Sequence, residues 1–151
     1  MEKVITIHDP GTWQAAAADS VSLVYDDRYR RRLVVESTAG RKLLLDRDTA
    51  APLLDGSALE IADGSLFQVV AAPEDLLEIR AHGVDHLVRL AWHLGNRHLP
   101  TELAADRLKV RYDHVIADMA RGLGADVNAI LEPFHPEGGA YGHGRVHDHE
   151  H

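Results

Sequence analysis

The sequence contains no cysteine, and this absence excludes disulfide bonds, thiolate metal sites and a cysteine nucleophile. It has no apolar run long enough to span a membrane, and Met1-Glu2-Lys3 opens no signal peptide, so we expect a cytoplasmic protein without a membrane partner. Positive charge is also scarce. The formal net charge of −8 argues against a nucleic-acid-binding protein that relies on contacts with backbone phosphates.

What the sequence does contain is enough apolar material for a folded core and an excess of histidine. The 151 residues allow one ordinary domain or two small ones, and 45% hydrophobic with 26% charged residues argues against global disorder. The 11 histidines are the most informative feature of the composition. Imidazole is a common ligand for zinc, copper and nickel, and it titrates near neutral pH.

Residues 1–72 have the pattern of a small β-rich domain. Short alternating runs are separated by turn signals such as Asp63-Gly64. The predicted strands are 4–7, 20–25, 32–38, 41–45, 59–61 and 66–70. We expect at most a turn or two of helix here, with residues 13–18 as the candidate. No cluster of catalytic residue types is present, which favours a scaffold or partner-binding module.

Residues 74–132 show a β-α-β-β-α-β order, with Pro73 as the boundary that interrupts strand pairing. The predicted elements are strand 75–81, a helix from Val84 ended by Gly95, strands 102–103 and 107–110, a helix capped by Asp113 and ended by Gly122 and Gly124, and strand 127–131 stopped by Pro133. This order is typical of a ferredoxin-like domain, a four-stranded antiparallel sheet backed by two helices. The predicted fold class is therefore α+β.

Residues 133–151 hold too little apolar material to fold, and we predict a mobile, histidine-rich tail. Its last residues alternate imidazole with carboxylate, a composition that can surround a metal ion. The candidate ligands are His143, His147, His149 and His151. The alternative is a merely solvated polar tail, and metal binding is the better explanation of this composition.

A second concentration of polar side chains lies at the end of the first predicted helix, where His98 follows Asn96-Arg97 in a loop. We take His98 as the central metal-ligand candidate. His114 is another, because the positive end of a helix dipole disfavours protonation of an imidazole in the first turn and leaves its lone pair available. His93 is assigned a structural role, and His82 and His86 are expected to be surface residues.

At these residues the chain resembles the UreE family, the urease accessory nickel metallochaperones. The resemblance covers nearly the whole length. It is carried by the motif Gly95-Asn96-Arg97-His98, by Arg111-Tyr112-Asp113-His114-Val115 and by Pro136-Glu137-Gly138-Gly139-Ala140-Tyr141-Gly142-His143. In the first domain it includes Leu54-Asp55-Gly56 and Val69-Val70-Ala71-Ala72-Pro73-Glu74.

The resemblance implies a nickel-delivery protein for urease assembly. It implies a homodimer through the second domain, with Ni(II) held between two copies of His98 on a twofold axis and tail histidines completing the site. Cu(II) and Zn(II) are rivals for the same ligands. The implied partners are the urease accessory GTPase and the urease pre-activation complex. Some members have another histidine two residues before the position of His114, where this sequence has Tyr112.

Two other functions compete with nickel delivery. A metal-dependent hydrolase would need about three fixed ligands and a nearby base, and only one motif histidine is well placed, so we expect a protein that is not an enzyme. A protein-holding chaperone would use the β-rich domain for binding and the tail only to buffer metal. Binding of unfolded peptides without metal would favour the chaperone.

Overall fold

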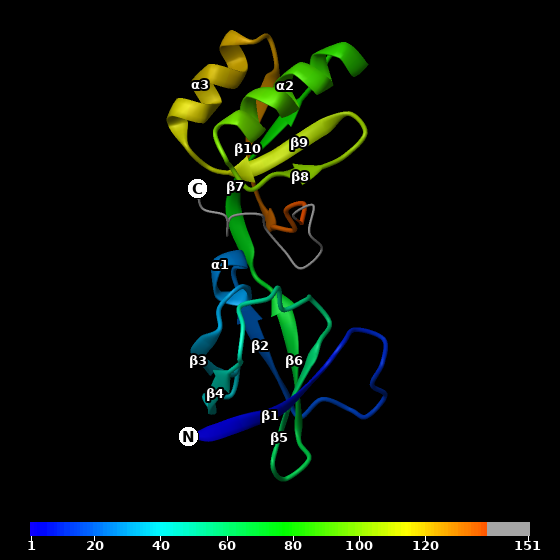
Figure 1. Ribbon diagram of the computed structural model, residues 1–151, viewed down its shortest axis with the longest axis vertical. Coiled ribbons are helices and arrows are strands. Elements are labelled where there is room, and N and C mark those ends of the chain that lie inside the picture. Colours follow the sequence, from blue (N-terminus) through cyan, green and yellow to red (C-terminus); the bar gives the residue numbers. More distant parts are fainter. Residues whose placement is uncertain (139–151) are drawn as a thin grey trace. The chain divides into compact units, whose positions relative to one another are not determined.

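The computed structural model describes residues 1–138 of a chain that divides into two compact units, Met1–Ala72 and Pro73–His151 (Figure 1). The first unit is β-rich and the second combines a sheet with two helices, so the predicted α+β class and two-part architecture are confirmed. The prediction of a mobile tail is wrong for its first residues, because Pro133 ends the last strand, Phe134 is fully buried and Glu137 is hydrogen-bonded to Thr101. From position 139 on, the predicted tail lies outside the described residues. No helix within residues 1–138 has both the length and the apolar character needed to cross a membrane.

The first unit is a six-stranded mixed sheet in the order β2-β6-β5-β1-β4-β3. Its strands are β1 (Glu2–His8), β2 (Asp19–Leu23), β3 (Arg32–Glu36), β4 (Lys42–Asp46), β5 (Ala58–Ile61) and β6 (Leu66–Ala71). The pairs β1–β4 and β2–β6 are parallel, and the others are antiparallel. Alternate strand residues face one core, which includes Val21, Val35, Leu43, Leu45, Leu59, Ile61, Phe67 and Val69.

The expected helix at residues 13–18 is wrong. Groups in this segment form hydrogen bonds with residues far away in the sequence. The Trp13 Nε1–H donates to the Gly56 carbonyl at 3.0 Å, and the Ala18 N–H donates to the Leu66 carbonyl at 2.8 Å. The unit's short helix is α1 (Tyr25–Arg28), which begins where the second predicted strand was expected to end. Tyr25 and Arg28 are both buried, so tertiary packing overrides the local strand pattern.

The second unit is a ferredoxin-like domain, as the sequence predicts. Its elements are β7 (Pro73–Arg80), α2 (Val84–Asn96), β8 (Glu102–Leu103), β9 (Arg107–Arg111), α3 (His114–Gly122) and β10 (Asp126–Pro133). The strand order is β10-β7-β9-β8 and every neighbouring pair is antiparallel. Both helices pack on one face of the sheet through Leu77, Ile79, Leu90, Leu94, Leu108, Val110, Ile116 and Ala120.

Two helix limits of this unit were predicted from capping residues, and one of the two predictions is wrong. Asp113 is the N-cap of α3, as predicted, and its carboxylate accepts the backbone N–H groups of Val115 at 2.8 Å and Ile116 at 3.3 Å. Gly95, however, does not end α2. The helix continues through Gly95 to Asn96, and Gly95 is not among the glycines with positive φ.

Pro73 and Pro133 do not stop strand pairing as expected. They pair with each other at the end of the β7–β10 ladder. A proline has no N–H to donate, so it is tolerated at the last position of a ladder, where no donor is needed.

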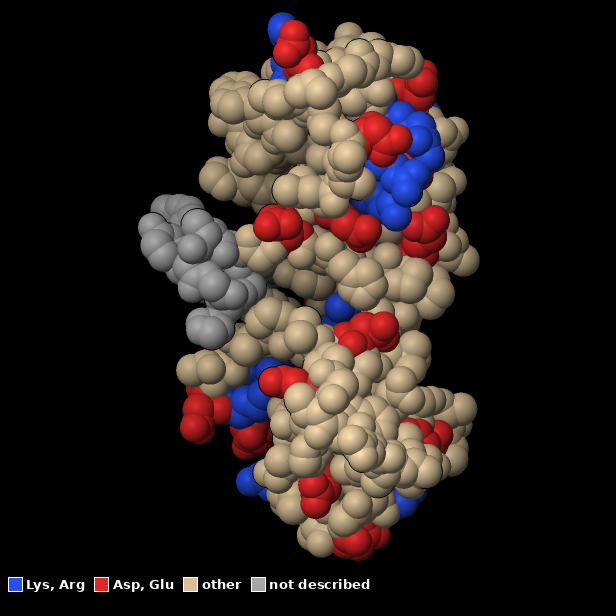
Figure 2. All heavy atoms as spheres, turned by 90° about the vertical axis from the view of Figure 1, so that its right-hand side faces the viewer, with Lys and Arg blue, Asp and Glu red and all other residues tan. Residues whose placement is uncertain are grey.

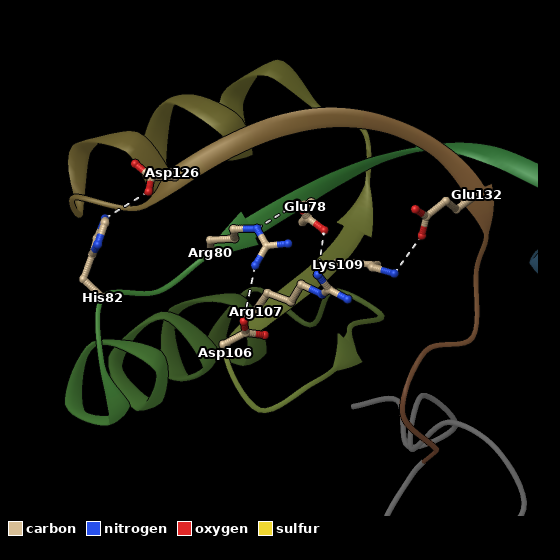
Figure 3. Close-up of polar contacts among 8 residues, drawn as sticks. All are labelled: Glu78, Arg80, His82, Asp106, Arg107, Lys109, Asp126 and Glu132. Carbon is tan, nitrogen blue, oxygen red and sulfur yellow. Dashed lines mark hydrogen bonds and ion pairs between the residues drawn. The ribbon is translucent and has the colours of Figure 1, made fainter.

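The face of the sheet opposite the helices carries a network of charged side chains (Figure 3). Glu78 contacts Arg80 at 3.1 Å and Arg107 at 3.3 Å, and Lys109 donates to Glu132 at 2.7 Å. Figure 2 shows basic and acidic side chains intermixed over the second unit. The hydrogen bond and charge of Lys109 hold the pKa of Glu132 below its ordinary value of 4.5.

We predict that Glu132→Gln lowers stability only where the carboxyl is ionised. A carboxyl whose folded-state pKa is depressed contributes stability that is present above its unfolded pKa and is lost as the pH falls through the folded pKa. At pH 7 the variant should therefore unfold at a lower urea concentration than the wild type. The difference should shrink as the pH falls below about 4.5 and vanish once the pH is below the folded-state pKa of Glu132. A difference that stays constant as the pH falls from 7 to 2 would show that the charge of Glu132 is not responsible.

Candidate metal centre

His98 occupies an unusual backbone position just after α2. Its φ is +60°, and among residues 1–138 it is the one residue other than glycine with a positive φ. The Leu99 N–H donates to the Leu94 carbonyl at 3.3 Å, and the His98 N–H donates to the Gly95 carbonyl at 2.9 Å. These two bonds form a Schellman motif, in which the left-handed position is normally glycine. Here that position holds an exposed histidine.

The core keeps His98 in this conformation. Leu94 is fully buried and Leu99 packs against the same hydrophobic cluster, which is the apolar contact that accompanies a Schellman motif. A left-handed conformation at a residue with a Cβ is unfavourable by about 1–2 kcal/mol. Such strain collects at functional sites, where a side chain must be presented in one direction. The sequence predicted a glycine stop at Gly95 and thereby missed that His98 itself is the strained residue.

Two further contacts hold the loop that carries His98. The Arg97 Nε–H donates to the Met119 sulfur of α3 at 3.1 Å, and the Thr101 hydroxyl donates to the Leu99 carbonyl at 2.9 Å. The loop is therefore tied to the second helix as well as to its own. An exposed imidazole on an ordered loop can bind a metal ion and remain accessible to a partner protein.

The first residues of the predicted tail lie against this loop. Phe134 is fully buried, the His135 N–H donates to the Glu102 carboxylate at 3.0 Å, and the Glu137 N–H donates to the Thr101 carbonyl at 2.7 Å. Residue 137 is thus fixed beside a residue three positions from His98. These contacts of His135 and Glu137 could not be predicted from the sequence, because backbone contacts between distant segments leave no local sequence pattern.

The other predicted ligands are distributed as follows. His114 is the exposed first residue of α3. His143, His147, His149 and His151 lie outside the described residues. Within residues 1–138, no three histidine, aspartate or glutamate side chains lie close enough together to hold a metal ion. In the described part of one chain, His98 and His114 therefore belong to no group of three potential ligands.

His86 is not the surface residue that the sequence suggested. It is half-buried; its Nδ1 accepts the His82 N–H at 2.9 Å, and its Nε2 lies 2.8 Å from the Leu123 carbonyl. A carbonyl accepts only a donor, so these partners fix the neutral tautomer with the proton on Nε2. Both ring nitrogens are thereby used. His86 joins the start of α2 to the end of α3, which is a structural role.

The helix that leads to His98 carries an exposed apolar stripe. Val84, Val88 and Trp92 are 73%, 63% and 62% exposed, and they follow one another at intervals of four residues on one face of α2. A hollow of about 480 Å³ on this face is lined by Asp85, Val88, Arg89 and Trp92. The His93 ring stands edge-on to Trp92, with the ring centroids 5.1 Å apart. Trp92, the last residue of the stripe, comes six residues before His98 in the sequence.

The backbone geometry predicts that His98→Gly does not destabilise the protein. Glycine removes the strain of the left-handed position but increases the conformational entropy of the unfolded chain. The free energy of unfolding should be unchanged or higher by up to about 1 kcal/mol. His114→Gly, the control at the first position of α3, should lower it by a few tenths of a kcal/mol, since glycine is a poorer helix former than histidine. Urea denaturation checks both, and a large loss of stability in His98→Gly would contradict the assignment of strain.

Comparison with known proteins identifies the family of the chain. Residues 1–72 match the model of the UreE urease accessory protein N-terminal domain, and residues 74–151 match that of the C-terminal domain. Proteins named urease accessory protein UreE are similar to it. That of Rhodopseudomonas palustris (strain HaA2) is 55% identical over 141 residues, which is 93% of this chain and 66% of the relative. That of Bradyrhizobium sp. (strain ORS 278) is 60% identical over 129 residues, 85% of this chain and 61% of the relative.

The chain thus spans less than two thirds of the length of these two relatives. The protein of the same name from Ruegeria pomeroyi is closer in length, being 46% identical over 145 residues that make up 96% of this chain and 95% of the relative. Because the two domain models together account for almost every residue, the chain belongs to the UreE urease accessory protein family.

Proposed function

We propose that this protein carries Ni(II) as cargo and delivers it to urease in the cytoplasm while the urease active site is assembled. The observation that carries the proposal is the strained, exposed position of His98 at the end of α2, in a member of the UreE family. An exposed side chain whose backbone conformation is held at an energetic cost is suited to a binding role rather than to packing.

The chemistry of the candidate ligands supports nickel over softer metals. The chain has no thiolate, and imidazole with carboxylate suits Ni(II), with Cu(II) and Zn(II) as competitors. A delivery protein must also release its ion. An open site on an exposed loop, which residues 1–138 of one chain do not complete, suits release better than an enclosed site does.

We propose that two copies of the chain share the ion. A twofold arrangement supplies one His98 from each protomer without requiring a full ligand set in either. The apolar stripe Val84, Val88 and Trp92 supports this arrangement, because it ends near His98 and an exposed tryptophan is a favourable centre for an interface. The proposed partners beyond the second copy are the urease accessory GTPase and the urease pre-activation complex.

Nickel titration of the full-length protein tests the role of His98. In His98→Asn the backbone is kept, since asparagine tolerates the left-handed conformation, and the imidazole is removed. We expect the dissociation constant of the strongest Ni(II) site, of which there is one per dimer, to rise at least about tenfold. Loss of a residue that only supports a metal ligand already lowers metal affinity by that factor. His82→Asn, an exposed histidine elsewhere in the same unit, is the matched control and should bind as the wild type does. Wild-type binding by His98→Asn would refute the proposal.

The shared site also predicts a link between Trp92 and dimer formation. Trp92→Ser should make the free energy of dimer formation less favourable by about 2 kcal/mol, as expected for the loss of a central aromatic residue from an interface. Val115→Ser is the control, because Val115 is also apolar and more than half exposed but lies on α3. Light scattering over a range of concentrations measures both. Equal dimer stability in the two variants would place the interface elsewhere.

A further inference from the structure

A pair of histidines joins the start of α2 to the end of α3. His82 lies just before the helix, and His86 lies in its first turn. The His82 N–H donates to His86 Nδ1 at 2.9 Å, and His86 Nε2 donates to the Leu123 carbonyl at 2.8 Å. The two rings are stacked, with their centroids 5.6 Å apart and their planes at 11°. We call these contacts the histidine latch.

The histidine latch has no place for a proton on His86 Nδ1. This nitrogen acts as the acceptor, because Nε2 must carry the hydrogen that is donated to the Leu123 carbonyl. A proton added to Nδ1 turns the acceptor into a donor, which then faces the N–H of His82. That hydrogen bond is lost, and the two N–H groups repel each other. The latch is therefore closed with a neutral His86 and opened by a charged one.

The ring of His82 responds to acid in the opposite way. Its Nε2 lies 3.3 Å from Oδ2 of Asp126 on β10, so a proton on this ring strengthens the contact with the carboxylate (Figure 3). The backbone N–H of His82 still bonds to His86 in that state. A second proton, on His86, would stack two positive rings against each other. Protonation of His86 is thus the step that opens the latch.

Other charged side chains of α2 and α3 do not counter a charge on His86. Asp85 and Arg89 line the hollow on the apolar stripe of α2, and Arg121 pairs with Asp118 at 3.8 Å. Within residues 1–138, no carboxylate forms a salt bridge with His86. The group of α3 that meets its ring is the uncharged Leu123 carbonyl.

The histidine latch holds the part of α2 where the apolar stripe begins. Val84 precedes His86 by two residues, and Val88 follows it by two. We propose that the latch makes dimer formation sensitive to acid: protonation of His86 opens it, loosens the first turn of α2 and weakens the interface built on the stripe. This inference rests on the twofold arrangement in the proposed function. It assigns neither histidine a contact with the metal.

Linkage gives the size of the effect. One hydrogen bond of ordinary strength favours the closed latch about fivefold. A free imidazole titrates near pH 6.5, so the closed state is favoured above this pH and is lost below it. Lowering the pH from 7.5 to 5.5 shifts the balance about tenfold toward the open latch. If only the closed latch supports the interface, two latches per dimer raise the dimer dissociation constant about sixfold.

The first experiment measures the latch itself, in metal-free full-length protein. Its readout is the exchange of the His82 amide with water by NMR, expressed as a protection factor that corrects for the direct effect of pH. Between pH 7.5 and pH 5.5 this factor should fall about fourfold in the wild type.

Two variants of His86 each keep one half of the latch. In His86→Asn an amide oxygen takes the place of Nδ1 and accepts the His82 N–H without titrating, so protection should not depend on pH. In His86→Gln the amide nitrogen takes the place of Nε2 and keeps the bond to Leu123, but no acceptor remains for His82. Protection in His86→Gln should therefore be low at both pH values.

The second experiment measures the dimer dissociation constant of the same metal-free proteins by light scattering at pH 7.5 and pH 5.5. The constant should rise about sixfold in the wild type and stay unchanged in His86→Asn. His135→Asn is the matched control, since it removes an exposed histidine of the same unit that lies outside the latch. It should show the wild-type response.

The outcomes separate this inference from the proposed function. Protection of His82 that does not fall in acid would overturn the latch. An equal rise of the dimer dissociation constant in the wild type and in His86→Asn would overturn its role in dimer formation. In both cases the proposed function stands if His98→Asn loses the strongest nickel site. Wild-type nickel binding by His98→Asn would refute the proposed function, whereas the two latch experiments contain no metal and do not depend on that result.

Discussion

The way α2 ends determines where the candidate metal centre lies. Leu90 and Leu94 hold the helix in the core of the second unit, and the Schellman motif then turns the chain so that His98 takes a left-handed conformation. Burial of Leu99 in the same cluster makes that turn favourable overall even though the histidine is strained within it. A buried apolar contact thus stabilises the presentation of an exposed polar group.

The same region collects contacts from the rest of the unit. Met119 of α3 accepts a hydrogen bond from Arg97, and the backbone N–H groups of His135 and Glu137 donate to Glu102 and Thr101. The open face of the ferredoxin-like sheet contributes through Lys109, whose charge joins β9 to β10 and β8. In the proposed function, this arrangement keeps one ligand rigid on an ordered loop. The same proposal takes the remaining ligands from a second copy and from the tail histidines, which would leave a route for release.

Much of the fold could be predicted from the sequence because its signals are local. Alternation marked the strand pairs β3–β4 and β5–β6, helical spacing marked α2 and α3, and Asp113 marked the start of α3. The errors arose where distant contacts decide the outcome. Trp13 bonds across the first unit to Gly56, and burial of Tyr25 and Arg28 stabilises a short helix in place of a strand end.

The candidate site was predictable in its residue types but not in its geometry. The position of His98 after a helix end could be inferred from the sequence. Its left-handed conformation could not, since Gly95 is a better local candidate for a helix stop. His86 looked like a surface residue because its partners, the Leu123 carbonyl and the His82 N–H, are backbone groups. The contacts of His135 and Glu137 could not be predicted for the same reason, since both use backbone N–H groups.

The most direct test of the account is a crystal structure of the nickel-loaded full-length protein with anomalous scattering recorded at the nickel edge. The account predicts a nickel ion on a twofold axis, bonded to the imidazole of His98 from each of two protomers. Nickel bonded only to other histidines, with His98 away from any metal, would contradict it.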